Sequence, residues 1–138
     1  MNTIFLIARI AFSAMFLIGA IGHLTKVDAM AQYVEYKSAP GGKAGVILSG
    51  LGIGIGGLSV LLGIYGDLGA LLIVVMVIGI NVFMHAFWKE TDPTTRMTEM
   101  TAFNKNIALI GGALAFFLLF ASAGAHVGWT ITGPLFSL

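Results

Sequence analysis

Four long apolar stretches constrain the fold of this chain more than any other feature. They run over residues 3–24, 43–64, 68–88 and 104–123. Each is close to the ~20 residues that a helix needs to cross about 30 Å of hydrocarbon. Their apolar residues are continuous rather than alternating, which favours helices over the strands of a membrane barrel. The sequence therefore predicts an all-α protein, an integral membrane four-helix bundle that forms a single domain over residues 1–138.

The composition agrees with a membrane protein. Hydrophobic residues make up 58% of the chain and charged residues 9%, whereas soluble domains carry about 25% charged residues. Lipid must therefore cover much of the apolar surface. The net charge of +1 argues against a nucleic-acid partner. The absence of cysteine excludes disulfides, thiolate catalysis and cysteine-ligated metals.

The connections between the apolar stretches differ in kind. Residues 28–37, in the first connection, look amphipathic and predict a short interfacial helix. The second connection, around residues 65–67, is very short, and we expect Asp67 to cap the following helix. The third is expected to contain a helical turn or two after Pro93. Residues 124–138 are too short and too broken for a fifth span, so we expect a tail.

Positive residues gather on one predicted side of the membrane. An even number of spans puts both termini on the same side. Apart from Arg9, every lysine and arginine lies in or beside the first and third connections, namely Lys26, Lys37, Lys43, Lys89, Arg96 and Lys105. The positive-inside rule then predicts that these two connections are cytoplasmic and that both termini are outside.

The second apolar stretch is rich in glycine. Gly50 and Gly54, and likewise Gly52 and Gly56, are four residues apart. A dinucleotide-binding loop would need a strand before it, and none is expected here. The spacing is typical of helices whose backbones approach closely in a membrane. We therefore expect this helix to be central in the bundle, and a homo-oligomer face or a ligand groove along it stays open.

Arg9 is an ionisable residue at membrane depth, where charge is costly and usually has a partner. Its side chain could snorkel to the outer interface. It could instead turn inward and pair with Asp67, which should lie on the same side. A third interpretation is that it holds an anionic headgroup.

A second polar group is expected at the opposite end of the bundle. Asn81 and His85 are four residues apart and share one helix face. His23 ends the first stretch at the same level, and further polar and aromatic residues join it there, namely Asn106, Lys105 and Trp88. Either these residues form an ordinary interfacial belt, or they line a ligand pocket.

A metal site is not assigned. His23, His85 and Glu99 are possible ligands, but no recognised ligand spacing supports them. Glu99 follows Arg96 by three residues, which suits a local ion pair instead.

Several short motifs resemble one family. The first stretch carries Arg9, then Gly22-His23 and Lys26, and the second carries Gly56-Gly57-Leu58. The most specific pattern is His85-Ala86-Phe87-Trp88 followed by Glu99 and residues 103–112. In these motifs the chain resembles the DoxX family of small four-helix membrane proteins, over about residues 6–118. It departs from the family in lacking a glutamate early in the second helix.

The resemblance implies a function. DoxX-like proteins are often labelled oxidoreductases, and some are described as subunits of thiosulfate–quinone oxidoreductase systems. It implies a multi-pass protein of a prokaryotic-type plasma membrane, with no intrinsic cofactor, a quinone as possible ligand and a separate redox partner protein. Candidate ligand-binding residues are His85, Asn81, His23, Asn106, Lys105, Trp88 and Arg9. The alternatives are a non-enzymatic binding or transport protein for a small lipophilic or anionic molecule, and a scaffold for a membrane complex.

Overall fold

The structure is a computed structural model that describes residues 2–124 and 128–138. Its elements are α1 (Asn2–Thr25), α2 (Val27–Tyr36), α3 (Gly42–Leu62), α4 (Gly66–Met84), the 3₁₀ turn η1 (Phe87–Lys89) and α5 (Pro93–Ala123). Helices α1, α3, α4 and α5 are long and apolar enough to cross a membrane. The described residues contain no strand. The predicted all-α membrane bundle of four spanning helices is confirmed. His126, expected to be a solvated tail residue, lies outside the described residues.

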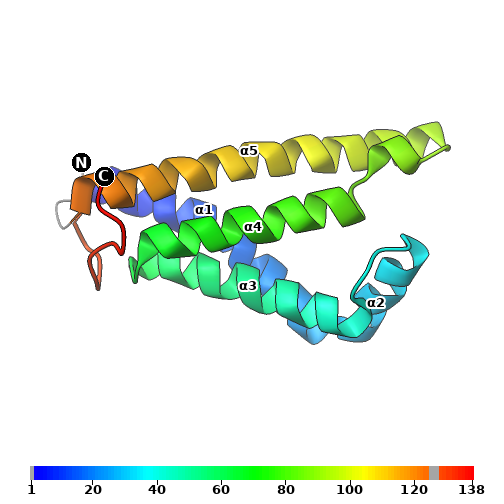
Figure 1. Ribbon diagram of the computed structural model, residues 1–138, viewed down its shortest axis with the longest axis horizontal. Helices are drawn as coiled ribbons and strands as arrows, with labels where there is room; N and C mark the ends of the chain where they lie inside the picture. Colours follow the sequence, from blue (N-terminus) through cyan, green and yellow to red (C-terminus); the bar gives the residue numbers. More distant parts are fainter. Residues whose placement is uncertain (1, 125–127) are drawn as a thin grey trace.

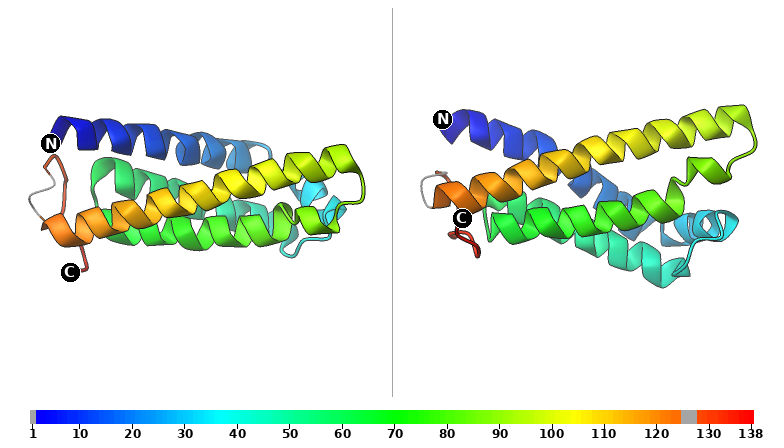
Figure 2. Two further views of the ribbon diagram at one scale, coloured as in Figure 1. Left: turned by 90° about the horizontal axis from the view of Figure 1, so that it is seen from above. Right: turned by 45° about the horizontal axis from the view of Figure 1, so that its top comes forward.

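The spanning helices pack in chain order. Helix α1 packs on α3, α3 on α4, and α4 on α5. Both termini lie at one end of the bundle, while α2 and the connection between α4 and α5 lie at the other (Figure 1). We call these the terminal end and the loop end. Two further views show the same division (Figure 2). At the loop end, α3 and α4 diverge (Figure 1).

The helical turns expected after Pro93 are present, but they are continuous with the last apolar stretch, so the last helix starts earlier than predicted. Helix α5 begins at Pro93 rather than near residue 104 and continues without a break to Ala123. Asp92 caps it, because its carboxylate accepts a hydrogen bond of 2.7 Å from the backbone N–H of Thr95. Pro93 suits the first helical position because its missing N–H would have no partner there. The polar segment after Pro93 therefore extends the membrane helix. Glu99 lies in this segment, past the C-terminal end of α4.

Helix α3 has the predicted central position. Gly50, Gly54 and Gly57 face α1, whereas Gly52 and Gly56 face α4. A Cβ atom on Gly56 would lie 2.7 Å from an isoleucine carbon of α4, closer than van der Waals contact allows. The glycines therefore bring three helices together within one chain.

Two apolar cores hold the elements in place. The larger is shared by the four spanning helices and includes Phe16, Ile53, Ile73 and Phe116. The smaller joins α2 to α3 through Ala31, Val34 and Val46. The predicted short amphipathic helix is thus confirmed as α2, with its apolar face on the bundle.

Arg9 neither snorkels to the interface nor pairs with Asp67. Its side chain is buried, with a relative exposure of 1%. Nε donates to the carbonyl of Val60 at 2.9 Å and Nη2 to that of Leu61 at 2.5 Å, while Nη1 donates to Trp129 O at 3.0 Å. The last four carbonyls of a helix have no partner within it. Arg9 therefore satisfies two of the carbonyls at the end of α3.

The C-terminal tail completes this arrangement. The N–H of Ile131 donates to the carbonyl of Leu62, and the Thr132 N–H donates to Gly63 O. Asp67 was expected to cap α4, but that prediction was wrong. Its Oδ2 instead accepts from the backbone N–H groups of Leu135 and Phe136, at 2.8 and 2.7 Å. The tail thus folds back onto the terminal end and holds it closed.

Candidate functional site

Five polar side chains meet at the loop end and form what we call the polar cluster. Glu99 is its centre. Its Oε1 accepts from the Tyr33 hydroxyl at 2.9 Å and lies 2.7 Å from Lys37 Nζ, and its Oε2 lies 2.8 Å from His85 Nδ1. Lys37 also donates to Glu90 at 2.5 Å. The side chains of Lys37 and Glu99 are only 8% and 7% exposed. These charges therefore interact with little screening by water.

Four different elements supply the cluster. Tyr33 lies on α2 and Lys37 directly follows it, while His85 ends α4 and Glu90 follows η1. Glu99 comes from the polar first part of α5. The expected ion pair between Glu99 and Arg96 is replaced by these long-range contacts. The cluster therefore ties α2 to the end of the bundle.

The cluster shifts the pKa values of its α2 members. Burial lowers the pKa of Lys37, but its hydrogen bonds to Glu90 and Glu99 outweigh this and raise the net value above that of a free lysine. Burial and the neighbouring Glu99 carboxylate raise the pKa of the Tyr33 hydroxyl. One lysine faces two carboxylates here, so the cluster keeps an unmatched negative charge while His85 is neutral.

A cavity of about 380 Å³ lies directly beside the polar cluster. It lies mainly between α2, α3 and α4, with His23 of α1 also on its wall, and we call it the α3–α4 pocket. Most of its wall is apolar and includes Met30, Val46, Met76, Ile80 and Phe83. Its size falls in the range of 300–1,000 Å³ that is typical of small-molecule sites. An apolar chamber with a few polar groups is suited to a lipophilic molecule that has a polar head.

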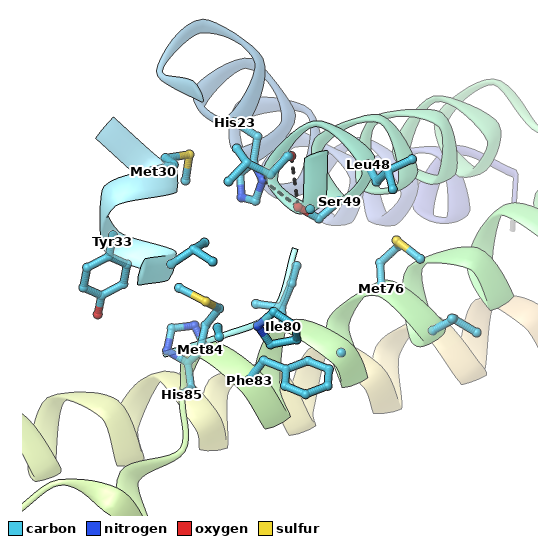
Figure 3. A pocket seen from close by; sticks show the side chains of 17 residues that line it. His23, Met30, Tyr33, Leu48, Ser49, Met76, Ile80, Phe83, Met84 and His85 are labelled. Carbon is cyan, nitrogen blue, oxygen red and sulfur yellow. Dashed lines mark hydrogen bonds between the residues drawn. The ribbon is translucent and has the colours of Figure 1, made fainter. Parts of the chain in front are cut away.

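Polar side chains reach the pocket from opposite sides. His23 comes from α1 and His85 from the end of α4 (Figure 3). His23 Nδ1 lies 3.0 Å from Ser49 Oγ and 3.2 Å from the carbonyl of Val46. His85 Nδ1 lies 2.8 Å from Glu99 Oε2, so the polar cluster holds one nitrogen of this imidazole. The structure thus brings the two predicted histidines to one cavity.

Asn81 and Asn106 do not line this pocket. Asn106 Nδ2 donates to Asn81 Oδ1 at 3.1 Å, and Asn81 Nδ2 donates to the carbonyl of Phe103 at 3.3 Å. Both residues are buried, at 2% and 7% exposure. They join α4 to α5 and satisfy each other inside the bundle, where an unpaired amide would be costly.

The other predicted ligand residues lie away from the pocket wall. Lys105 is exposed on α5. Trp88 is 52% exposed and packs edge-on against Phe87 and Phe103. Arg9 lies at the terminal end, with its guanidinium bonded to carbonyls. Ligand binding by any of these residues stays a prediction.

Sequence reasoning missed four residues of this region, namely Tyr33, Lys37, Ser49 and Glu90. Lys37 and Glu90 could have been noticed as opposite charges in the two connections of the same predicted end. Tyr33 and Ser49 gave no signal, because their roles depend on how α2 and α3 pack. Within residues 2–124 and 128–138, no group of three histidine, cysteine or acidic side chains could hold a metal ion.

Comparison with known families decides the relationship. The DoxX family model matches residues 4–86. The chain belongs to the DoxX family. The matched part contains α1 to α4 and ends just after His85, so the expected likeness in α5 lies outside it. No curated protein and no solved structure matches the chain.

The DoxX match covers the whole pocket but only part of the polar cluster. The α3–α4 pocket is built wholly within the matched residues, from His23 to His85. Glu90 and Glu99 of the polar cluster lie beyond them. The pocket thus belongs to the DoxX portion of the chain, and α5 adds the carboxylate that contacts His85.

Proposed function

We propose that this DoxX family protein binds the head of a quinone, or of a similar lipophilic molecule, in the α3–α4 pocket as the membrane subunit of a quinone-linked redox system. The observation that carries the proposal is an apolar cavity of about 380 Å³ with two imidazoles on its wall. A ring with oxygen substituents can meet the histidines, while its apolar tail follows the helices into lipid.

A redox role would require a partner protein. The chain has no cysteine, and nothing in its side chains carries electrons on its own. The partner would deliver or remove electrons at the bound quinone. Tyr33 and His85 of the polar cluster line the pocket, as does His23, so ionisable side chains are present beside the proposed ligand.

Binding can be tested with a short-chain quinone. The purified protein in lipid nanodiscs is titrated with a decyl-substituted benzoquinone, and binding is followed by quenching of tryptophan fluorescence. Gly79 lies on the pocket wall, and a Cβ atom there meets nothing within 4 Å. Gly79→Leu should therefore fill the pocket and weaken binding at least tenfold.

Gly111→Leu is the matched control. Gly111 also has open space beside it, but it is exposed on α5 and does not line the pocket. This variant should bind the quinone like the natural protein. Equal binding by the Gly79→Leu and natural proteins, or no saturable binding at all, would remove the proposal.

Binding or transport without redox chemistry is the second candidate. The observation that favours it is the mostly apolar wall of the pocket, which suits a lipophilic molecule whether or not that molecule is redox-active. Mass spectrometry of lipids that copurify from native membranes separates the two. A quinone that is lost in Gly79→Leu supports the first proposal, and another lipophilic molecule lost in the same variant supports the second. A scaffold role predicts no specific occupant.

We further propose that the loop end faces the cytoplasm of a prokaryotic-type plasma membrane, because the lysines and arginines other than Arg9 gather in and beside the first and third connections. Cysteine can be introduced singly, since the chain has none. Ser38→Cys should resist a membrane-impermeant maleimide in intact cells, whereas Ser137→Cys should react. The reverse labelling pattern would show that the loop end faces outward, which contradicts this proposal.

A homo-oligomer along α3 would use a different face from the glycines. The glycines are occupied by α1 and α4 of the same chain. The outward face of α3 carries Leu51, Ile55, Leu58 and Leu62. Crosslinking of single cysteines on this face in native membranes would detect such an assembly.

A further inference from the structure

We infer that His85 takes a proton from a hydroxyl group on the head of the pocket ligand, and that Glu99 positions the imidazole and stabilises the imidazolium that forms. The inference rests on the proposed binding of a ring-headed ligand in the α3–α4 pocket. It adds an acid–base function to the proposed binding site.

The geometry at His85 assigns roles to its two nitrogens. Nδ1 lies 2.8 Å from Glu99 Oε2. A carboxylate accepts hydrogen bonds, so Nδ1 carries the hydrogen and Nε2 of the neutral ring has a free lone pair. His85 lines the pocket, and its side chain is 23% exposed. A ligand hydroxyl in the pocket would therefore meet a proton acceptor.

The polar cluster around His85 contains three charged side chains. Glu99 and Glu90 bring two negative charges, and Lys37 brings one positive charge. Tyr33 donates to Glu99 from α2 and adds no charge while its hydroxyl is protonated. His23 is the titratable group on the opposite wall. Protonation of His85 thus neutralises the unmatched negative charge of the polar cluster.

The proton transfer balances without an oxidant. The O–H bond of the ligand breaks, its electron pair stays on oxygen, and a new N–H bond forms at His85 Nε2. The products are a bound aryloxide and an imidazolium held by Glu99. This is the arrangement in which a buried carboxylate orients a histidine base and stabilises its charged form. For a quinol, it would be the first deprotonation before electrons leave.

A coloured phenol can report the transfer. The probe is 2-decyl-4-nitrophenol, whose phenolate absorbs visible light, added to the protein in zwitterionic nanodiscs. Its ionisation midpoint should lie at least one pH unit lower with protein than with empty nanodiscs. That shift is a tenfold rise in the phenolate-to-phenol ratio at a fixed pH below the midpoint.

Variants assign the effect to named residues. His85→Gln should bind the probe but lose the shift. Glu99→Gln should bind it with a smaller shift, since the imidazolium loses its carboxylate. Glu35→Gln is the control, because Glu35 is an exposed carboxylate on α2. It should keep the full shift. An equal shift in His85→Gln and in the natural protein overturns the inference.

Two further measurements keep the inference testable if Glu99→Gln fails to fold. The methyl ether of the probe cannot ionise, so its binding reports the pocket alone. Failure of both phenol and ether to bind counts against the proposed function, whereas binding of both without any ionisation shift counts against proton transfer only.

In ¹⁵N spectra of the natural protein, His85 should be protonated at Nδ1 alone without probe and at both nitrogens with it. A ring already protonated at both nitrogens without probe would overturn the inference.

Discussion

The two ends of the bundle handle buried charge in opposite ways. At the terminal end, Arg9 and Asp67 bond to backbone carbonyls and N–H groups of α3 and of the C-terminal tail. At the loop end, Lys37, Glu99 and His85 bond to one another, beside an open pocket. Charges that bond to backbone groups hold helices together. Side chains that bond to one another beside an open pocket can also transfer protons and contact a ligand. We therefore expect the terminal end to contribute more to stability, and the loop end to combine a smaller contribution with the proposed ligand site.

The largest effect should come from Arg9→Leu. It removes the donors to Val60 and Leu61 and leaves buried carbonyls without partners. We expect a loss of on the order of 3 kcal/mol in the free energy of unfolding. The loss for Arg9→Lys should be smaller than for Arg9→Leu, because lysine keeps the charge but lacks the planar guanidinium that donates to several carbonyls. Thermal unfolding in detergent, followed by circular dichroism, measures both.

Arg96→Leu is the control for that experiment, since Arg96 is exposed on α5. It should leave the melting temperature nearly unchanged. Equal melting temperatures for Arg9→Leu and Arg96→Leu would show that the terminal end does not depend on this buried cation.

Lys37→Met should have the next largest effect. It leaves Glu90 and Glu99 facing each other without a cation in a largely buried setting. We expect a loss on the order of 2 kcal/mol and earlier proteolysis of α2. Lys43→Met removes an ion pair with Asp28 that is exposed on both sides, and it should change nothing measurable. A double-mutant cycle with Glu99→Gln gives the coupling energy, and a value near zero contradicts the predicted linkage.

Glycine-to-alanine substitutions compare the tightly packed terminal end with the pocket near the loop end. A Cβ atom on Gly66, at the terminal end, would lie 2.5 Å from the Phe120 ring. Gly66→Ala should therefore cost about 1–3 kcal/mol through overpacking. Gly79→Ala, on the pocket wall, meets open space and should be neutral or gain up to about 1 kcal/mol in helix propensity. The opposite order of melting temperatures would contradict this contrast.

The smallest effect is a pH dependence at the loop end. The pKa of Lys37 is raised in the folded protein, so its contribution to stability is complete below the unfolded value near 10.5 and is lost as the pH rises through the folded value. The difference in melting temperature between the natural protein and Lys37→Met should stay constant from pH 7 to 9.5. It should shrink only above about pH 10.5. Shrinkage already at pH 8 would mean that Lys37 is not held as a cation by its two carboxylates.

Much of the architecture was predictable because apolar length is a local property. Continuous hydrophobic stretches predicted all four spanning helices and the amphipathic pattern predicted α2, since lipid and backbone chemistry leave no other solution. The start of α5 was not predictable from hydropathy, because the segment from Pro93 to Phe103 is polar. Its helicity depends on the Asp92 cap and on the tertiary contacts of Glu99.

Two residues of the candidate site could be found in the same way. Helical spacing and position along the spans brought His23 and His85 to one level. The same reasoning also suggested Asn81 and Asn106 as ligand donors, although the structure pairs these two residues with each other. Spacing along a helix gives the face that a residue occupies, but the partner across that face depends on how the neighbouring helix is rotated.

The sequence by itself determined the membrane class, the number of spans and the central glycine-rich helix, because each follows from the length or composition of a single segment. Only the tertiary structure decided that Arg9 caps α3, that the tail binds Asp67, and that Lys37, Glu90 and Glu99 meet beside His85. Those contacts join residues far apart in the chain. Their energies exist only once the helices have packed, so no local pattern could have contained them.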